Sequence, residues 1–168
     1  MRSAAHPPAL RHDTVPCQRC GTGPCVPAQT SGTHVTPDSG EYITFPPPQE
    51  AYANAPDLRR EMHRVLALGA ERDGRAARPT TGPPVDARTA ERVWLLRRAA
   101  LMDRMALGKP GPVAAAADTA EQLVQYDRCH PDLVAGPHPP DAITLALDHR
   151  PYVRQEYAAW TAAGRPGI

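Results

Sequence analysis

The feature that most constrains the fold is the stretch 86–107, which reads as a helix that is apolar on nearly every side. It begins at Asp86, a good N-cap residue, and ends before Gly108. A helix that is apolar around most of its circumference has to be surrounded by other elements. We therefore expect this helix to form the centre of the fold, with five of its charged residues reaching the surface between its neighbours. The apolar residues are Val93, Trp94, Leu95, Leu96, Leu101, Met102, Met105 and Leu107, and the charged ones in question are Arg92, Arg97, Arg98, Asp103 and Arg104.

Four further stretches are interpreted as helices, and most of them have apolar residues at helical spacing. The stretch 113–127 has a face of small and aliphatic residues, which favours close packing on the central helix. The sequence predicts an all-α fold, a small irregular bundle of three to five helices. We expect the helices near 57–73, 86–107, 113–127, 141–148 and 151–163.

Two of these helices have predicted buried faces. In the first helix we expect Leu58, Met62, Val65, Leu66 and Gly69 to face inward, with Arg59, Arg60, His63 and Arg64 outside. In the last helix Val153, Tyr157 and Trp160 share one face, and we interpret them, together with Trp94, as core residues.

The remainder of the chain is poor in core-forming residues. Leu, Ile, Val and Phe number 26 of 168 residues, about 15%, whereas Pro and Gly together number 33. Residues 1–55 are therefore expected to be a flexible, proline-rich and largely irregular N-terminal arm, and 56–168 the helical domain. A small β-hairpin over 33–45 is the one regular element that we expect in the arm.

Charge is distributed unevenly along the chain. Residues 51–110 hold twelve basic and seven acidic residues, whereas 111–168 hold four basic and seven acidic residues, so the two parts are expected to pack on each other. Most arginines of 51–110 are interpreted as a solvated helix surface with local pairs such as Glu61 with Arg64 and Arg88 with Glu91. The alternative is that they contact the phosphates of a nucleic acid, although the chain's pI of about 7.8 is low for such a domain.

Three of the four cysteines lie close together, at Cys17, Cys20 and Cys25. The form Cys-x-x-Cys-Gly at 17–21 resembles the first knuckle of a zinc ribbon, which implies thiolate ligands to zinc. The second Cys-x-x-Cys pair of a ribbon is missing at the expected distance. If zinc binds, we expect Cys17, Cys20 and Cys25 as ligands with His34 as the fourth, and His12 or the Cys129-His130 pair as alternatives.

Two other interpretations of the cysteines remain open, a metal-free thiol loop and a redox pair. The redox interpretation lacks the strand–helix context that lowers a thiol pKa in Cys-x-x-Cys oxidoreductases. The pair Cys129-His130 is read as a helix C-terminus rather than as a nucleophile and base, because adjacent side chains point apart.

The sequence holds no run of 18 apolar residues and no apolar N-terminal signal region, so we expect no membrane span and a cytoplasmic protein. No common catalytic motif occurs either. The leading hypothesis is a non-catalytic interaction or regulatory protein with a protein partner, stabilised by zinc where the knuckle binds it. The alternatives are a zinc-assisted nucleic-acid-binding protein that uses residues 51–110, and a small enzyme without a recognisable motif.

Overall fold

The computed structural model describes residues 43–77, 86–108, 111–143 and 148–165, all within the unit Val35–Ile168. These residues form helices and connecting turns and contain no strand, so the expected all-α class is confirmed. The α-helices are α1 (Pro48–Ala51), α2 (Leu58–Ala77), α3 (Ala87–Ala106), α4 (Val113–Cys129) and α5 (Arg150–Ala162). Two short 3-10 helices, Pro131–Leu133 and Pro140–Ile143, lie in the connection between α4 and α5.

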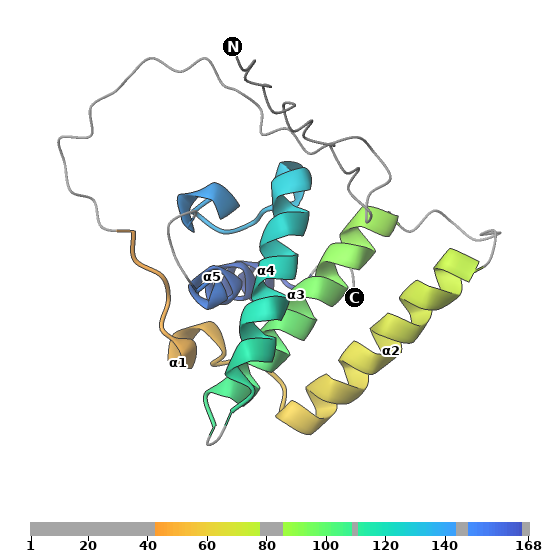
Figure 1. Ribbon diagram of the computed structural model, residues 1–168, viewed down its shortest axis with the longest axis horizontal. Helices are drawn as coiled ribbons and strands as arrows, with labels where there is room; N and C mark the ends of the chain where they lie inside the picture. Colours follow the sequence, from red (N-terminus) through yellow and green to blue (C-terminus); the bar gives the residue numbers. More distant parts are fainter. Residues whose placement is uncertain (1–42, 78–85, 109–110, 144–147, 166–168) are drawn as a thin grey trace, which may run out of the picture. The chain divides into compact units, whose positions relative to one another are not determined.

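Helix α3 is the central element, as its sequence predicts. It lies between α2 and α4 and also packs against α5 (Figure 1). Asp86 caps its first turn, because the carboxylate accepts hydrogen bonds from the Arg88 amide at 3.1 Å and the Thr89 hydroxyl at 2.6 Å. Leu95 and Leu96 are almost completely buried at its middle. Packing against α2, α4 and α5 therefore stabilises this helix.

Small residues allow α3 and α4 to approach closely. Ala99 and Ala100 of α3 and Ala116 and Ala120 of α4 are all buried. Close-packed interiors of this kind gain many dispersion contacts for each residue. The turn between the two helices depends on Gly111, because a Cβ there would lie 2.6 Å from backbone atoms of Ala106. The predicted close packing of these two helices is confirmed.

Helix α5 closes the core with aromatic residues. Val153, Tyr157 and Trp160 are buried as predicted, and the rings of Tyr157 and Trp160 lie 5.6 Å apart. The Tyr52 ring meets Tyr157 edge-on at 5.3 Å, which ties the turn after α1 to α5. The structure therefore adds a short packed helix within the last residues of the stretch that the sequence assigns to the arm.

Helix α2 turns a different face to the bundle from the one predicted. Its buried residues are Glu61, Val65 and Leu68, whereas Leu58, Met62 and Leu66 are 39%, 42% and 65% exposed. The prediction is confirmed for Val65 and for Gly69, which is half-buried against the Trp94 side chain of α3, and is wrong for Leu58, Met62 and Leu66. The helix lies at the edge of the bundle and packs against α3, so most of its circumference is free to face solvent (Figure 1).

Polar contacts explain the rotation of α2. The Glu61 carboxylate accepts two hydrogen bonds of 2.7 Å from Arg97 of α3. Arg72 pairs with Glu91 of α3, and its guanidinium lies 4.4 Å from the centre of the Trp94 ring. A charged residue counts as outward in a hydrophobic pattern, so the pattern assigned Glu61 to the wrong side.

Two smaller expectations have different outcomes. Residues 43–45 form no strand, and the rest of the hairpin expected over 33–45 lies outside the described residues. The helix expected at 141–148 is seen as the 3-10 helix Pro140–Ile143, beyond which 144–147 are not described. In the part of the chain that the structure describes, no helix is long and apolar enough to cross a membrane.

Candidate functional site: the arginine face of α2

The predicted zinc ligands lie outside the described residues. This applies to Cys17, Cys20, Cys25 and His34, and also to the alternative ligand His12. Among the residues that the structure describes, no group of three or more His, Cys, Asp or Glu could hold a metal ion. The zinc site therefore stays a prediction about the N-terminal part of the chain.

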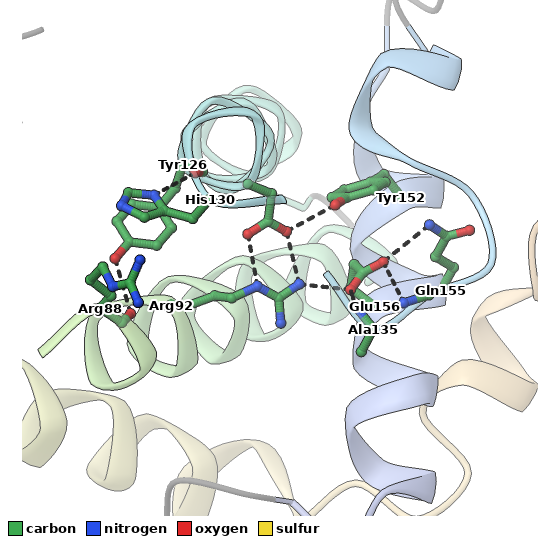
Figure 2. A network of polar contacts seen from close by, with 10 residues as sticks. Arg88, Arg92, Tyr126, His130, Ala135, Tyr152, Gln155 and Glu156 are labelled. Carbon is green, nitrogen blue, oxygen red and sulfur yellow. Dashed lines mark hydrogen bonds and ion pairs between the residues drawn. The ribbon is translucent and has the colours of Figure 1, made fainter. Parts of the chain in front are cut away.

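Cys129 and His130 mark a helix end, as interpreted from the sequence. α4 ends at Cys129, and His130 is its C-cap residue. The His130 ring stacks on Tyr126 at 4.2 Å, with Nδ1 3.0 Å from the Tyr126 carbonyl oxygen (Figure 2). Cys129 is disulfide-bonded, so in this state its sulfur is not a thiolate that could bind a metal.

Three charged residues of α3 that were expected at the surface are buried instead. Arg92 and Arg97 are each 6% exposed and Asp103 is completely buried. The expectation is wrong because each of them meets opposite charge from a neighbouring element, which a single-helix pattern cannot show. Buried charges need such partners, since an unpaired charge is very costly to remove from water.

Arg92 is the centre of the largest of these networks (Figure 2). Its guanidinium donates two 2.8 Å hydrogen bonds to Asp127 of α4 and one of 2.7 Å to Glu156 of α5. The Tyr152 hydroxyl donates to Asp127 at 2.9 Å. These contacts join α3, α4 and α5 and confirm that the basic middle of the chain packs on the acidic last third.

The pKa values in this network follow from burial and pairing. Burial by itself would lower the pKa of Arg92, but the bonds and charges of Asp127 and Glu156 outweigh it and raise that pKa. Burial raises the pKa of Asp127, while its bonds from Arg92 and Tyr152 act in the opposite direction. Arg92 therefore stays positively charged at the centre of the bundle.

Glu156 also holds the connection that precedes α5. Its two carboxylate oxygens accept hydrogen bonds from the backbone amides of Ala135 at 3.0 Å and Gly136 at 2.9 Å (Figure 2). Gly136 lies so close to the Glu156 carboxylate and the Gln155 side chain that a Cβ has no room there. Because the charges of Arg92, Asp127 and Glu156 are paired within the protein, this network is a structural element.

The third buried charge of α3 forms a separate network. Asp103 accepts hydrogen bonds from the Tyr52 hydroxyl at 2.7 Å and from Arg154 of α5 at 2.8 and 2.9 Å. Together with the Arg92 network and the Arg97–Glu61 pair, these contacts link α3 to α2, α4 and α5 and to the turn after α1. The local pairs expected from sequence, Glu61 with Arg64 and Arg88 with Glu91, are wrong because these acids serve contacts between helices.

The remaining arginines of α2 are different. Every arginine of α3, α4 and α5 has a polar side-chain contact within the described residues. In contrast, the side chains of Arg59, Arg60, Arg64 and Arg75 make none with the residues that the structure describes. Three of these four lie in the first two turns of α2. We call the side chains of residues 58–67 that are not buried in the bundle the arginine face of α2.

Exposed apolar residues share this part of the helix. Leu58, Met62 and Leu66 follow one another at intervals of four residues, so they form a stripe along α2. Arg59 lies next to this stripe, at i−3 from Met62 and i−4 from the exposed His63. Apolar side chains bordered by cations make a surface suited to binding an anionic, partly apolar partner.

A cleft lies along the other flank of the arginine face. Its volume is about 660 Å³, and basic side chains from three parts of the chain line it: Arg60 and Arg64 of α2, Arg97 of α3, and Arg165 after α5. Among the described residues that line it Glu61 is the one acid, and both of its oxygens are bonded to Arg97. The cleft therefore carries uncompensated positive charge.

The sequence predicted that Arg59, Arg60 and Arg64 face outward, but indicated a role for them only as members of a basic segment. Their signal was present in the spacing, because Arg60 and Arg64 lie four residues apart and therefore share one side of the helix. What the sequence lacked was the identity of the partner of Glu61, which lies on α3. Comparison with known proteins finds no matching family model, no matching curated protein and no matching solved structure, so the functional argument rests on this geometry.

Proposed function

We propose that this chain is a non-catalytic interaction protein whose arginine face binds an acidic amphipathic helix of a partner protein. The observation that carries the proposal is the stripe of Leu58, Met62 and Leu66, 39–65% exposed, beside a cation that has no partner in the described residues. Large apolar side chains exposed in a row on a helix are typical of contact surfaces.

The chemistry of the partner follows from the face that it would cover. A helix with apolar residues at intervals of three and four positions can bury them against this stripe. Glu or Asp residues beside its apolar positions would meet Arg59. Opposite charge of this kind mainly raises the association rate and selects the partner, while apolar burial supplies most of the affinity.

The test uses a displayed library of amphipathic helices of about 20 residues, long enough to span the stripe, with random residues on either side of the apolar positions. We expect the selected binders to be enriched in Glu and Asp at those positions. Met62→Glu and Leu66→Glu should weaken binding at least about tenfold, because each places a like charge against the acidic binder and removes apolar contact.

Ala114→Glu on α4 is the matched control, since it adds the same charge at an exposed position of another helix. It should leave binding unchanged, and all three variants should keep the free energy of unfolding within about 0.5 kcal/mol of the parent. Binders without acidic enrichment, or an equal loss in Ala114→Glu, would contradict the proposal.

Nucleic-acid binding is the second candidate, because unpaired arginines also suit phosphate backbones. It predicts that duplex or single-stranded DNA or RNA binds the protein with a strong salt dependence. The Leu66→Ala and Arg59→Ala variants separate the two candidates, because neither adds a negative charge that would repel phosphates. A backbone contact depends on Arg59 and hardly on Leu66, whereas the proposed helix contact depends on both.

The zinc knuckle is a separate part of the proposal and concerns Cys17, Cys20, Cys25 and His34. Native mass spectrometry of the intact chain, expressed with zinc and kept reduced so that all four cysteines are thiols, should show one zinc ion for each chain. Cys17→Ser should lose it, because a thiolate ligand is removed. A metal-free parent chain, or zinc retained fully in Cys17→Ser, would rule out this ligand set.

A further inference from the structure

We propose that the cleft beside α2 binds a phosphate group, either as free inorganic phosphate or as the phosphate of a small ester. This site lies on the opposite flank of α2 from the apolar stripe, and it goes beyond the proposed partner binding. The positive charge of the cleft supports this proposal. Arg60, Arg64 and Arg165 line one cleft of about 660 Å³, and the single acid in the lining is neutralised by Arg97.

Arg165 is held at the cleft by its backbone and by its guanidinium group. Its backbone has φ of 58°, a conformation that non-glycine residues seldom adopt and that tends to occur at functional sites. The Arg165 amide donates to the Trp160 carbonyl oxygen at 2.9 Å and closes the C-terminus of α5. Its guanidinium donates to the Asn54 carbonyl oxygen in the turn before α2. The chain thus bends back to bring a cation to the cleft.

Arg97, which is the deeply buried cation among the described lining residues, has a fixed position. Its Nε and Nη2 atoms are each 2.7 Å from a Glu61 oxygen, and its guanidinium carbon lies 5.6 Å from the centre of the Trp160 ring. Its Nη1 atom has no hydrogen-bond partner among the described residues. When a carboxylate fixes one edge of a guanidinium group, the remaining N–H groups can bind a ligand with little further loss of side-chain conformational entropy.

A phosphate group suits this arrangement better than a carboxylate. Phosphate carries up to two charges and three or more acceptor oxygens, so it can bond to several guanidinium groups at once. The volume of the cleft is in the range of small-molecule sites. Among the described residues no Phe, Tyr or Trp lines it, so it offers no stacking surface for a nucleobase.

The test measures binding by isothermal titration calorimetry of the full chain with inorganic phosphate, glucose 6-phosphate and acetate at constant ionic strength. We expect phosphate or its ester to bind, and acetate, a carboxylate with a single charge and two oxygens, to bind at least about tenfold more weakly. Arg60→Gln and Arg64→Gln should each weaken binding about tenfold or more, because each removes a charge-assisted hydrogen bond. Binding stronger for phosphate than for the ester identifies free phosphate as the ligand, and the reverse identifies an ester.

Arg59→Gln is the matched control, since Arg59 is equally without a partner in the described residues but does not line the cleft. It should change the affinity less than about twofold. The proposal is overturned by no heat of binding up to about 10 mM phosphate, by acetate binding as tightly, or by an equal loss in Arg59→Gln. None of these results bears on the apolar stripe, so this site and the partner face fail independently.

Discussion

Asp127→Ala is expected to lower the free energy of unfolding by about 3–5 kcal/mol, because it leaves Arg92 buried without its main partner. The Asp127 carboxylate receives both bonds of the Arg92 fork and the Tyr152 hydroxyl bond, and none of the three side chains is more than 7% exposed. Domains of this size are stable by about 5–15 kcal/mol, so the loss is a large share of the total. Urea unfolding followed by circular dichroism measures it.

The control is an ion pair of the same kind at the surface. Arg88 and Asp132 lie 3.7 Å apart with their side chains 56% and 57% exposed. Asp132→Ala should therefore cost no more than about 1 kcal/mol. Equal costs for the two substitutions would show that the Arg92 network does not hold the bundle together in the way that we describe.

Raising the pH above 10 is expected to destabilise the protein steeply, through its buried tyrosines. Burial raises the pKa of Tyr152, and the charges of Asp127 and Glu156 raise it further. Burial likewise raises the pKa of Tyr157, with Glu61 adding to the effect, and that of Tyr52, with Asp103 adding to it. All three hydroxyls therefore stay protonated in the folded chain at pH values where they ionise in the unfolded chain.

The sign of the effect follows from this difference. The folded state holds these protons more tightly, so its advantage is complete below pH 10, the ordinary tyrosine pKa, and is lost as the pH rises above it. Tyr152 and Tyr52 each contribute about 1.4 kcal/mol for each pH unit, so together they remove about 3 kcal/mol by pH 11, and Tyr157 adds to the loss in the same direction.

Urea unfolding at a series of pH values from 8 to about 11 tests this prediction. Tyr152→Phe is the control variant: it should be less stable at neutral pH by about 1–2 kcal/mol through the lost bond to Asp127. Above pH 10 its stability should fall less steeply than that of the parent chain. A free energy of unfolding that stays constant up to pH 11 in the parent would contradict the account.

The sequence predicts those parts of the fold that depend on hydrophobic period alone. The central position of α3, the small-residue contact with α4, and the buried Val153, Tyr157 and Trp160 of α5 are all confirmed. Apolar residues that are numerous around a helix, or regularly spaced along it, indicate burial whatever their partners are.

The errors come from charged residues whose partners lie far away in the sequence. Glu61 is separated from Arg97 by 36 residues, and Arg92 from Glu156 by 64. A carboxylate that has such a partner can be buried, and it then turns Leu58 and Leu66 toward solvent. The same fact hid the candidate site, because the unpaired arginines of α2 stand out only after every other arginine has found its partner.

The most direct measurement of the central claim is site-specific photo-crosslinking in the cells that express this protein, with a photoreactive amino acid at Leu66 or, as a control, at the exposed Asp118 of α4. The captured peptides are identified by mass spectrometry. The account predicts that Leu66 captures one acidic segment with apolar residues at helical spacing, and that Arg59→Glu abolishes this capture while the Asp118 position never shows it. Capture of nucleic acid, of basic or patternless segments, or of nothing beyond the control position would contradict it.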